Sequence, residues 1–310
     1  MSLQHPSNLR PLCESAVRQT TEALARVDML PDASSGTLSV PSHRAVHRIV
    51  DLCRSMLFPG FFGESSVSRS GVAYHIGVAA EELMSLLTSQ IVASLSFCSG
   101  CGNHSDNAVL KARDFILQLP EMRRVLTADV EATYAGDPAA TSVEEVIFSY
   151  PGVRATISYR IAHALTLLDV PVLPRMVSEM AHSETGIDIH PAASIGEGLM
   201  IDHGTGVVIG ATAIIGRNVK IYQGVTLGAR SFVRDAGNNP VKGLPRHPIV
   251  GDNVVIYSNT TVLGRITIGE GAVIGGNLWV TESVAPGERL VQAPADNIVR
   301  IKKTMTHIWR

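Results

Sequence analysis

The chain has 310 residues, which is long enough for two domains and a sizeable hydrophobic core. Its 26 basic and 28 acidic residues give a formal net charge of -2, so neither nucleic acid nor a membrane surface is an expected partner. The N-terminus has no apolar run behind a basic segment, and no stretch of about 18 apolar residues is apparent. Neither a signal peptide nor a membrane span is therefore predicted, and the expected location is the cytoplasm.

The first half of the chain is predicted to be mainly helical. Residues 1–41 form an N-terminal segment, partly ordered, with one helix at about 8–28. Apolar residues then recur at helical spacing, which predicts helices at about 42–56, 76–97, 106–118, 120–134 and 141–147. A last helix, at about 151–168, has Pro151 in its first turn. We expect a helical domain at 42–150 and a connecting helix at 151–185.

All four cysteines lie in the first third of the chain. Cys98 and Cys101 form a C-x-x-C, with His104 three residues further on, which is typical of a zinc or redox site. A tetrahedral zinc site needs a fourth ligand, and no second C-x-x-C supplies one, although Cys53 is a candidate. The alternative is a pair of thiols in a Gly-rich turn that ends a helix. We favour this alternative and expect no metal.

The second half of the chain has a period of six residues. The aliphatic residues at this spacing are Ile189, Ile195 and Ile201, then Ile209, Ile215, Ile221 and Leu227, and finally Val250, Ile256, Val262, Ile268, Ile274 and Val280. Period six is typical of short strands joined by tight corners, with one aliphatic side chain per strand pointing inward. Three hexapeptides make one triangular coil, and each coil buries its aliphatics against its neighbours. The sequence therefore predicts a parallel β-helix at 186–285, with a tail at 286–310.

The period fails at two places, and both are rich in ionisable residues. Ile201 to Ile209 is two residues too long and contains Asp202 and His203. Leu227 to Val250 spans 23 residues and ends in a segment that contains Arg246 and His247. Local rules tend to fail at functional sites. We expect the β-helix to hold these two interruptions against one another.

The chemistry available at the interruptions is limited to a few roles. Histidine can serve as a general base near neutral pH, and a carboxylate on its other ring nitrogen would fix its tautomer. Asp188 lies 14 residues before Asp202, close to one coil of about 18, so it could approach His203. Arg246 offers a forked donor that suits a carboxylate. Each residue alone is more simply a surface corner residue or a solvated charge, but their joint presence at the only two breaks favours a site.

Several segments resemble the serine O-acetyltransferases of bacteria and plants over about residues 130–285. The segments are Asp188-Ile-His-Pro-Ala-Ala-Ser-Ile-Gly-Glu-Gly-Leu-Met-Ile-Asp202-His203-Gly-Thr-Gly, Val225-Thr-Leu-Gly228, Arg246-His247-Pro248 and the upstream Tyr159-Arg-Ile-Ala-His163. The resemblance implies a left-handed β-helix behind a mainly helical N-terminal domain. It also implies transfer of acetyl from acetyl-CoA to the hydroxyl of L-serine, which is the entry step to cysteine.

The resemblance assigns a role to each site residue. His203 would deprotonate the serine hydroxyl for direct attack on the thioester, and Asp188 would orient it. The remaining residues would bind the substrates: Asp137 and Asp202 the ammonium of serine, Arg246 and His247 its carboxylate, and the backbone at Ala229, Ser258 and Gly276 the CoA. The family also implies a trimer or dimer of trimers, with acetyl-CoA between neighbouring prisms, and L-cysteine as feedback inhibitor.

Three features depart from the common family pattern. The connection before Arg246 is long here, which is expected to reshape a lid over the acceptor site. Val273 stands where the family often has a Lys that contacts CoA. The family docks a terminal Ile into cysteine synthase, whereas this tail ends in Trp309 and Arg310, so that partner is not expected to bind in the usual way.

Three alternatives remain open on the residues. A hexapeptide acetyltransferase could act on homoserine or a sugar, and homoserine differs from serine by one methylene, which a pocket separates by only about 1–3 kcal/mol. A carbonic anhydrase type of metal site would use His190, His203 and His247 as ligands, but the spacing of these three lacks a close His pair. A non-catalytic scaffold would lack the ionisable residues at the breaks.

Overall fold

The computed structural model describes residues 10–25, 40–63, 68, 70–99 and 105–293. Two compact units are distinguished, residues 1–39 and residues 40–310. The first contains the helix α1 (Arg10–Ala25). The second contains a group of helices followed by fourteen short strands. Cys101, the tail residues Trp309 and Arg310, and the side chain of Cys98 lie outside the described part of the chain, so the zinc and cysteine synthase hypotheses concern residues that are not described.

The helices of the second unit follow the predicted apolar spacing with two corrections. They are α2 (His43–Leu57), α3 (Val72–Ser99), α4 (Ser105–Gly136), α5 (Val143–Ser149), α6 (Pro151–Leu167) and α7 (Leu173–Thr185). The expected single connecting helix is wrong, because α6 and α7 are separated by a turn in which Asp169 and Val172 have positive φ angles of 51° and 64°.

The expectation of two separate helices at about 106–118 and 120–134 is also wrong, since α4 is one helix of 32 residues with Pro120 inside it. An interior proline costs about 3 kcal/mol, because it removes one hydrogen bond and crowds the preceding turn. Phe115 and Leu119 before the proline and Met122 and Leu126 after it all pack in the helical core. Their burial holds both halves of α4 on the same core and offsets the cost of the proline.

Helix α3 contains a segment, Val72–Ser96, that is long and apolar enough by length and composition to cross a membrane. The sequence analysis missed this segment. One such helix is weak evidence for a membrane span, since core helices of soluble proteins meet the same criteria. Leu83, Leu87 and Ile91 of this segment are fully buried and belong to the core that α3 shares with the other helices of this unit.

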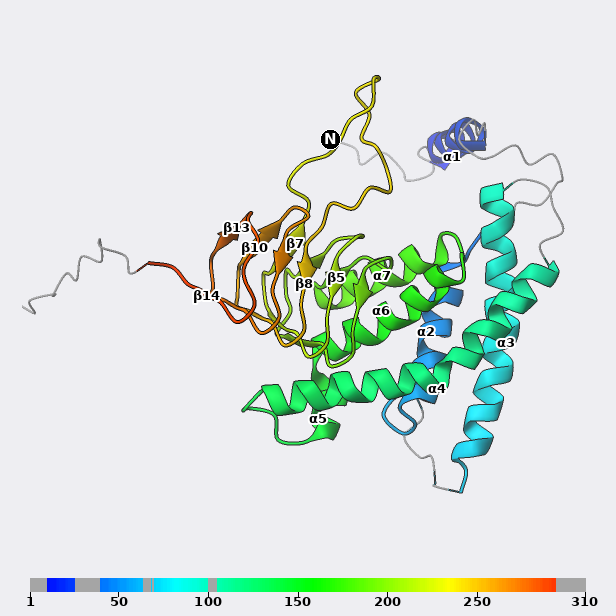
Figure 1. Cartoon of the computed structure of the whole chain (residues 1–310). Helices are drawn as coiled ribbons and strands as arrows, with labels where there is room; N and C mark the ends of the chain where they lie inside the picture. The colour runs from blue at the N-terminus through cyan, green and yellow to red at the C-terminus, as the bar shows by residue number, and fades with distance from the viewer. Residues whose placement is uncertain (1–9, 26–39, 64–67, 69, 100–104, 294–310) are drawn as a thin grey trace, which may run out of the picture. The chain divides into compact units, whose positions relative to one another are not determined.

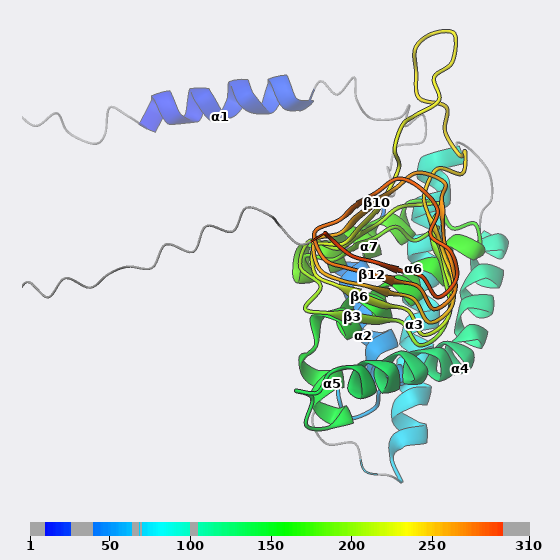
Figure 2. The same cartoon turned by 60° about the vertical axis from the view of Figure 1, so that its left-hand side comes forward.

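The strands build the parallel β-helix that the six-residue period predicted, with the left hand that the family resemblance implied. All pairings are parallel, and the three sheets have the orders β1-β4-β7-β10-β13, β2-β5-β8-β11 and β3-β6-β9-β12-β14. Figure 2 shows the coils stacked on one another. The strands are β1 (Asp188–Ile189), β2 (Ser194–Ile195), β3 (Met200–Asp202), β4 (Val208–Ile209), β5 (Ile214–Ile215), β6 (Lys220–Tyr222), β7 (Thr226–Gly228), β8 (Ile249–Val250), β9 (Val255–Ile256), β10 (Thr261–Leu263), β11 (Thr267–Ile268), β12 (Val273–Ile274), β13 (Trp279–Val280) and β14 (Arg289–Leu290).

Each coil therefore has three corners, and two of them matter for function. We call the turns that follow β3, β6, β9 and β12 the His203 corner, because the first of them contains His203. We call the turns that follow β1, β4, β7 and β10 the Arg246 corner, because Arg246 lies in the connection after β7. In the β1-β4-β7-β10-β13 sheet, the strands begin at the His203 corner and end at the Arg246 corner.

Helix α6 packs against the N-terminal end of the β-helix, which we call the prism, and connects the helices to it. Ala155 and Tyr159 belong to the same core as the inward aliphatics of the strands, and Tyr159 Oη donates to Ala193 O at 2.7 Å. A Cβ on Gly152 would lie 2.1 Å from Ile201 O, so only glycine permits this approach of α6 to β3. Arg160 donates to the carbonyl oxygens of two strand-end residues and to the buried Asp129 of α4. The helical part is thereby held beside β3, the strand that leads to His203.

Candidate functional site

The His203 corner begins with a turn that places a histidine in an unusual backbone conformation. His203 has φ 54°, in the left-handed region that non-glycine residues rarely adopt, and Gly204 and Gly206 follow with φ 82° and 78°. A Cβ on Gly204 would lie 2.3 Å from Ile187 Cδ1, so the turn is packed tightly against the preceding coil. The result is a histidine side chain that is 74% exposed, with Nδ1 3.9 Å from Oδ1 of the largely buried Asp202.

A second carboxylate reaches this corner from the helical part of the chain. Asp137 follows α4, and its two oxygens accept hydrogen bonds from Tyr150 Oη at 2.5 Å and from Ala139 N at 2.8 Å. The bond from Tyr150 holds the pKa of Asp137 below its usual value, and the positive charge that His203 can carry acts in the same direction. Asp137 raises the pKa of Tyr150 in turn, to about 12. Asp137 therefore remains ionised beside His203.

Two tyrosines extend the His203 corner along the prism axis. Tyr222 pairs in register with Asp202, and its ring stacks on that of Tyr257 in the next coil, with centroids 5.0 Å apart and 14° between planes. Burial raises the pKa of Tyr222, and the charges of Asp202 and Asp137 add to this effect. The sequence analysis missed both tyrosines and Tyr150. The repeated pairs Ile221-Tyr222 and Ile256-Tyr257, at the same place in two coils, were the available signal.

The Arg246 corner is organised around a threonine. Thr212 Oγ1 accepts hydrogen bonds from the backbone N–H groups of Arg246 at 2.9 Å and His247 at 3.2 Å. The backbone N–H of Thr212 donates to His247 Nδ1 at 3.1 Å, so the ring proton of neutral His247 resides on Nε2. Burial lowers the pKa of His247 to about 4, with further lowering by Arg246, His190 and Arg265. His247 is therefore a neutral, fixed hydrogen-bond donor at neutral pH.

The arginine of this corner is positioned from two sides. The guanidinium of Arg246 lies 5.6 Å from the centre of the Phe232 ring, and its Nε is buried without a partner. Arg265, one coil further along, donates from Nη1 to Thr212 O at 2.7 Å and to His247 O at 3.0 Å. Arg265 thus ties the Arg246-His247 segment to two coils. Thr212 and Arg265 were also missed by the sequence analysis, because the corner side chains of regular coils resemble ordinary surface residues.

The long connection between β7 and β8, residues 229–248, forms an arm that stands away from the prism (Figures 1 and 2). Its two limbs are joined by an antiparallel bridge between Arg234 and Pro240 and by a hydrogen bond from Val241 N to Val233 O. Phe232 and Val233 on one limb are mostly exposed. The arm returns to the prism at the Arg246-His247 segment, so its root is part of the Arg246 corner.

The predicted site residues fall into two groups that do not meet within one chain. Asp137, Asp202 and His203 gather at the His203 corner, and Ser258 and Gly276 lie in later turns of the same corner, where a Cβ on Gly276 would be 3.1 Å from Ser258 O. The others, Arg246, His247 and Ala229, lie at the Arg246 corner. The expectation that the two interruptions lie against one another is therefore wrong for a single chain.

Asp188 lies at the start of β1, in the sheet that separates the two corners. Among the described residues, the carboxylate within 4 Å of a His203 ring nitrogen is that of Asp202. Burial lowers the pKa of His190, and Asp188 acts against this lowering. The role of Asp188 in orienting His203 stays a prediction. His190 lowers the pKa of His247 at the Arg246 corner, away from His203. The three histidines do not form a metal site, and the described part of the chain has no group of three His, Cys, Asp or Glu side chains that could hold an ion.

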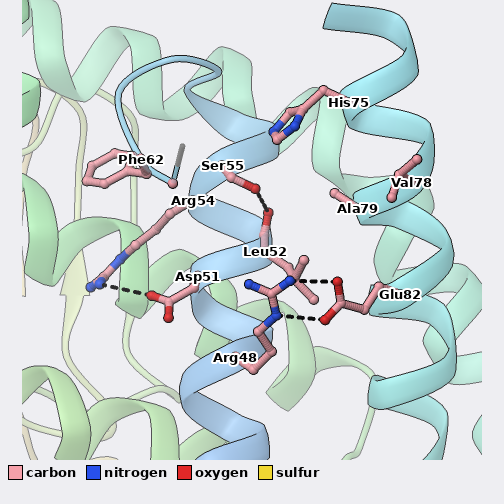
Figure 3. Close-up of a pocket in the computed structure, with 11 residues that line it drawn as sticks. Arg48, Asp51, Leu52, Arg54, Ser55, Phe62, His75, Val78, Ala79 and Glu82 are labelled. Carbon is pink, nitrogen blue, oxygen red and sulfur yellow. Dashed lines mark hydrogen bonds and ion pairs between the residues drawn. The ribbon is translucent and has the colours of Figure 1, made fainter. Parts of the chain in front are cut away.

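Another cavity lies away from the prism, between α2 and α3 (Figure 3). It has a volume of about 650 Å³ and is lined by charged residues. Arg48 binds Glu82 through two bonds of 2.7 and 2.6 Å, and Arg54 binds Glu184 at 3.3 Å, while Arg54 Nε and His75 Nε2 are buried without a partner. Paired charges of this kind hold helices together, so we take the two corners of the prism as the functional site.

Part of the prism matches a known family of repeats. Residues 247–282 match the family model described as bacterial transferase hexapeptide (six repeats). A serine acetyltransferase of Synechococcus elongatus is 45% identical over 279 residues, which cover 87% of this chain and 88% of that protein. The chain belongs to the serine acetyltransferase family. A second member, from Mycobacterium tuberculosis, is 44% identical over 57% of this chain and 73% of its own length.

Solved structures of serine acetyltransferases extend the likeness to the helical part. The crystal structure of Entamoeba histolytica serine acetyltransferase 1 in complex with L-cysteine has a TM-score of 0.71 and 35% identity, over 90% of this chain and 97% of that one. The soybean serine acetyltransferase complexed with serine has a TM-score of 0.53 and 30% identity, over 82% and 98%. The serine acetyltransferase fold therefore includes both the helices and the prism described above.

Proposed function

We propose that this protein transfers the acetyl group of acetyl-CoA to the hydroxyl of L-serine, releasing O-acetylserine and CoA. The observation that carries the proposal is the exposed His203 beside the carboxyl groups of Asp202 and Asp137, in a chain of the serine acetyltransferase family. His203 accepts the hydroxyl proton while the serine oxygen attacks the thioester carbonyl. The tetrahedral intermediate then expels the CoA sulfur, which takes the proton back from the imidazolium.

The charges of the two corners suit the two ends of an amino acid. Asp137 and Asp202 supply negative charge near His203 for the substrate ammonium, and the rings of Tyr150 and Tyr222 line the same place. Arg246, with an unpaired buried Nε, and His247, with its proton on Nε2, supply donors for the carboxylate. A sugar has neither charge, so this arrangement favours an amino-acid acceptor.

Because these two groups lie at different corners, one chain does not complete an acceptor site. We propose a homotrimer in which the His203 corner of each prism faces the Arg246 corner of its neighbour, with acetyl-CoA between the two prisms. Ser258 and Gly276 would then contact the CoA from one chain and Ala229 from the other. L-Cysteine has the same ammonium and carboxylate as serine, with a thiol in place of the hydroxyl, so we propose that it competes at this site.

The test is the release of free thiol from acetyl-CoA by the full chain in the presence of L-serine, L-homoserine or a sugar alcohol. We expect serine to be the best acceptor and L-cysteine to inhibit competitively with serine. Turnover with homoserine or the sugar alcohol but not with serine would contradict the proposed acceptor. N-Acetylserine should be a poor acceptor, because it lacks the ammonium that Asp137 and Asp202 would bind.

A further inference from the structure

The root of the arm borders an open cavity of about 320 Å³ that the acceptor site does not account for. It extends along the Arg246 corner over three coils, from Arg246 after β7, past Arg265 after β10, to Thr281 after β13. Arg230, at the start of the arm, completes a set of three arginines in the lining. The lining that the structure describes contains no aspartate or glutamate.

None of these three positive charges is paired with a carboxylate in the described part of the chain. Arg265 donates to two neutral carbonyl groups, and Arg246 lies against the Phe232 ring with its Nε unpaired. Arg230 makes no hydrogen bond or ion pair with any described residue. The chain as a whole has more acidic than basic residues, so this concentration of unpaired arginines is a local feature. Such a cluster favours an anion with several negative charges.

The carboxylate of an amino acid would neutralise one arginine and leave two. Acetyl-CoA carries its thioester at one end of a long arm and a diphosphate and a 3′-phosphate at the other, so its phosphates must lie some distance from the acetyl group. Arg265 lies in the coil of Ser258, and Thr281 in the coil of Gly276, the two residues predicted to contact CoA at the other corner. The cavity therefore lies in the same coils of the β-helix as the predicted CoA contacts. The phosphates of an acetyl-CoA that lies between two prisms are expected at this level along the prism axis.

We propose that the cavity at the root of the arm binds the phosphate groups of the acetyl donor through Arg230 and Arg265. This inference rests on the proposed use of acetyl-CoA. It gives the long arm a function, since Arg230 belongs to the arm.

Arg230→Gln is the cleanest test, because the side chain is exposed and its guanidinium holds nothing else in place. With serine saturating, we expect kcat/KM for acetyl-CoA to fall about tenfold, the usual effect of losing one charge-assisted hydrogen bond. S-Acetylpantetheine, which has no phosphate, should show no loss, and the KM for serine should not change. Acetyl-dephospho-CoA identifies the phosphate: an equal loss assigns Arg230 to the diphosphate, and no loss assigns it to the 3′-phosphate.

Arg234→Gln is the matched control, since Arg234 lies on the same arm outside the cavity and donates only to Asn238 O. It should leave the kinetics with all three donors unchanged. A loss in Arg230→Gln that is the same for acetyl-CoA and S-acetylpantetheine, or no loss with either, would overturn the proposal.

Calorimetric titration of the full chain with adenosine 3′,5′-bisphosphate separates this proposal from the proposed function. Binding that weakens about tenfold in Arg230→Gln, in a protein that does not acetylate serine, would support the phosphate cavity and contradict the acceptor. Equal binding of the bisphosphate to Arg230→Gln and to the unaltered protein would overturn the cavity's role whatever the acetyltransferase activity.

Discussion

The His203 corner and the Arg246 corner lie at opposite ends of the strands of one sheet, yet they carry opposite charge and are built differently. The His203 corner gathers carboxylates and tyrosines, and it recruits Asp137 and Tyr150 from the helical part of the chain. The Arg246 corner gathers arginines, and these are positioned by Thr212 and by the root of the arm. The regular repeat thus presents a negatively charged group of side chains at one corner and a positively charged group at the other, and the proposed trimer would bring the two groups together.

Removal of the predicted base should have the largest effect on the His203 corner. We expect His203→Ala to lower kcat by about 100-fold to 10,000-fold, the usual range for losing a general base. The measurement is thiol release at saturating serine and acetyl-CoA, together with the mass of the assembly in solution. His182→Ala is the control, since His182 is exposed on α7 beside Glu179 and should leave kcat unchanged. Full activity of His203→Ala would rule out this histidine as the base.

The Arg246 corner should respond in binding more than in turnover. Arg246→Lys keeps the charge but loses the planar fork that matches a carboxylate, so we expect the KM for serine to rise about tenfold or more while kcat changes less. Steady-state kinetics with varied serine measures this. Arg217→Lys, at an exposed arginine of the third corner that binds Asp252, is the control. A serine KM that is unchanged in Arg246→Lys would show that this corner does not bind the acceptor carboxylate.

The smallest effect is expected from Tyr150, which acts on substrate through Asp137. Tyr150→Phe removes the bond that holds the pKa of Asp137 low, so this pKa should rise and the KM for serine should rise about threefold to fivefold, as for one lost hydrogen bond. The KM for serine should also rise more at low pH in the variant, because Asp137 then takes up a proton sooner. Tyr74→Phe, an exposed tyrosine of α3, is the control. Identical pH profiles of the serine KM for the variant and the unaltered protein would contradict an effect of Tyr150 on serine binding through Asp137.

The prism could be predicted from the sequence because each inward aliphatic is a local signal. Ile256 and Ile274 are buried where the six-residue period places them, whatever happens elsewhere in the chain. The same six-residue period could also have predicted that the two interruptions lie at different corners. Counting one face per aliphatic through both irregular steps puts the turn after Ile201 and the connection after Leu227 at different corners. The expectation that the two interruptions lie against one another in one chain did not take this count into account.

The features that sequence reasoning missed depend on tertiary packing. Tyr150 and Asp137 are 13 residues apart, in the turns at either end of α5, and only the docking of these turns beside β3 brings them to His203. Thr212 and Arg265 likewise belong to turns 53 residues apart that stacking places in contact. The continuity of α4 through Pro120 had the same cause, because the buried residues on both sides of the proline outweigh its local preference.

Mixed assemblies test most directly whether the acceptor site is shared between chains. His203→Ala and Arg246→Ala chains, each expected to have little activity alone, should be co-expressed with different tags and purified together. If each site takes His203 from one chain and Arg246 from its neighbour, random mixing should restore about a quarter of the unaltered activity. Chains carrying His203→Ala and Asp202→Asn, both at one corner, should not restore it. Mixed His203→Ala and Arg246→Ala assemblies that remain as inactive as either variant alone would contradict a site built from two corners.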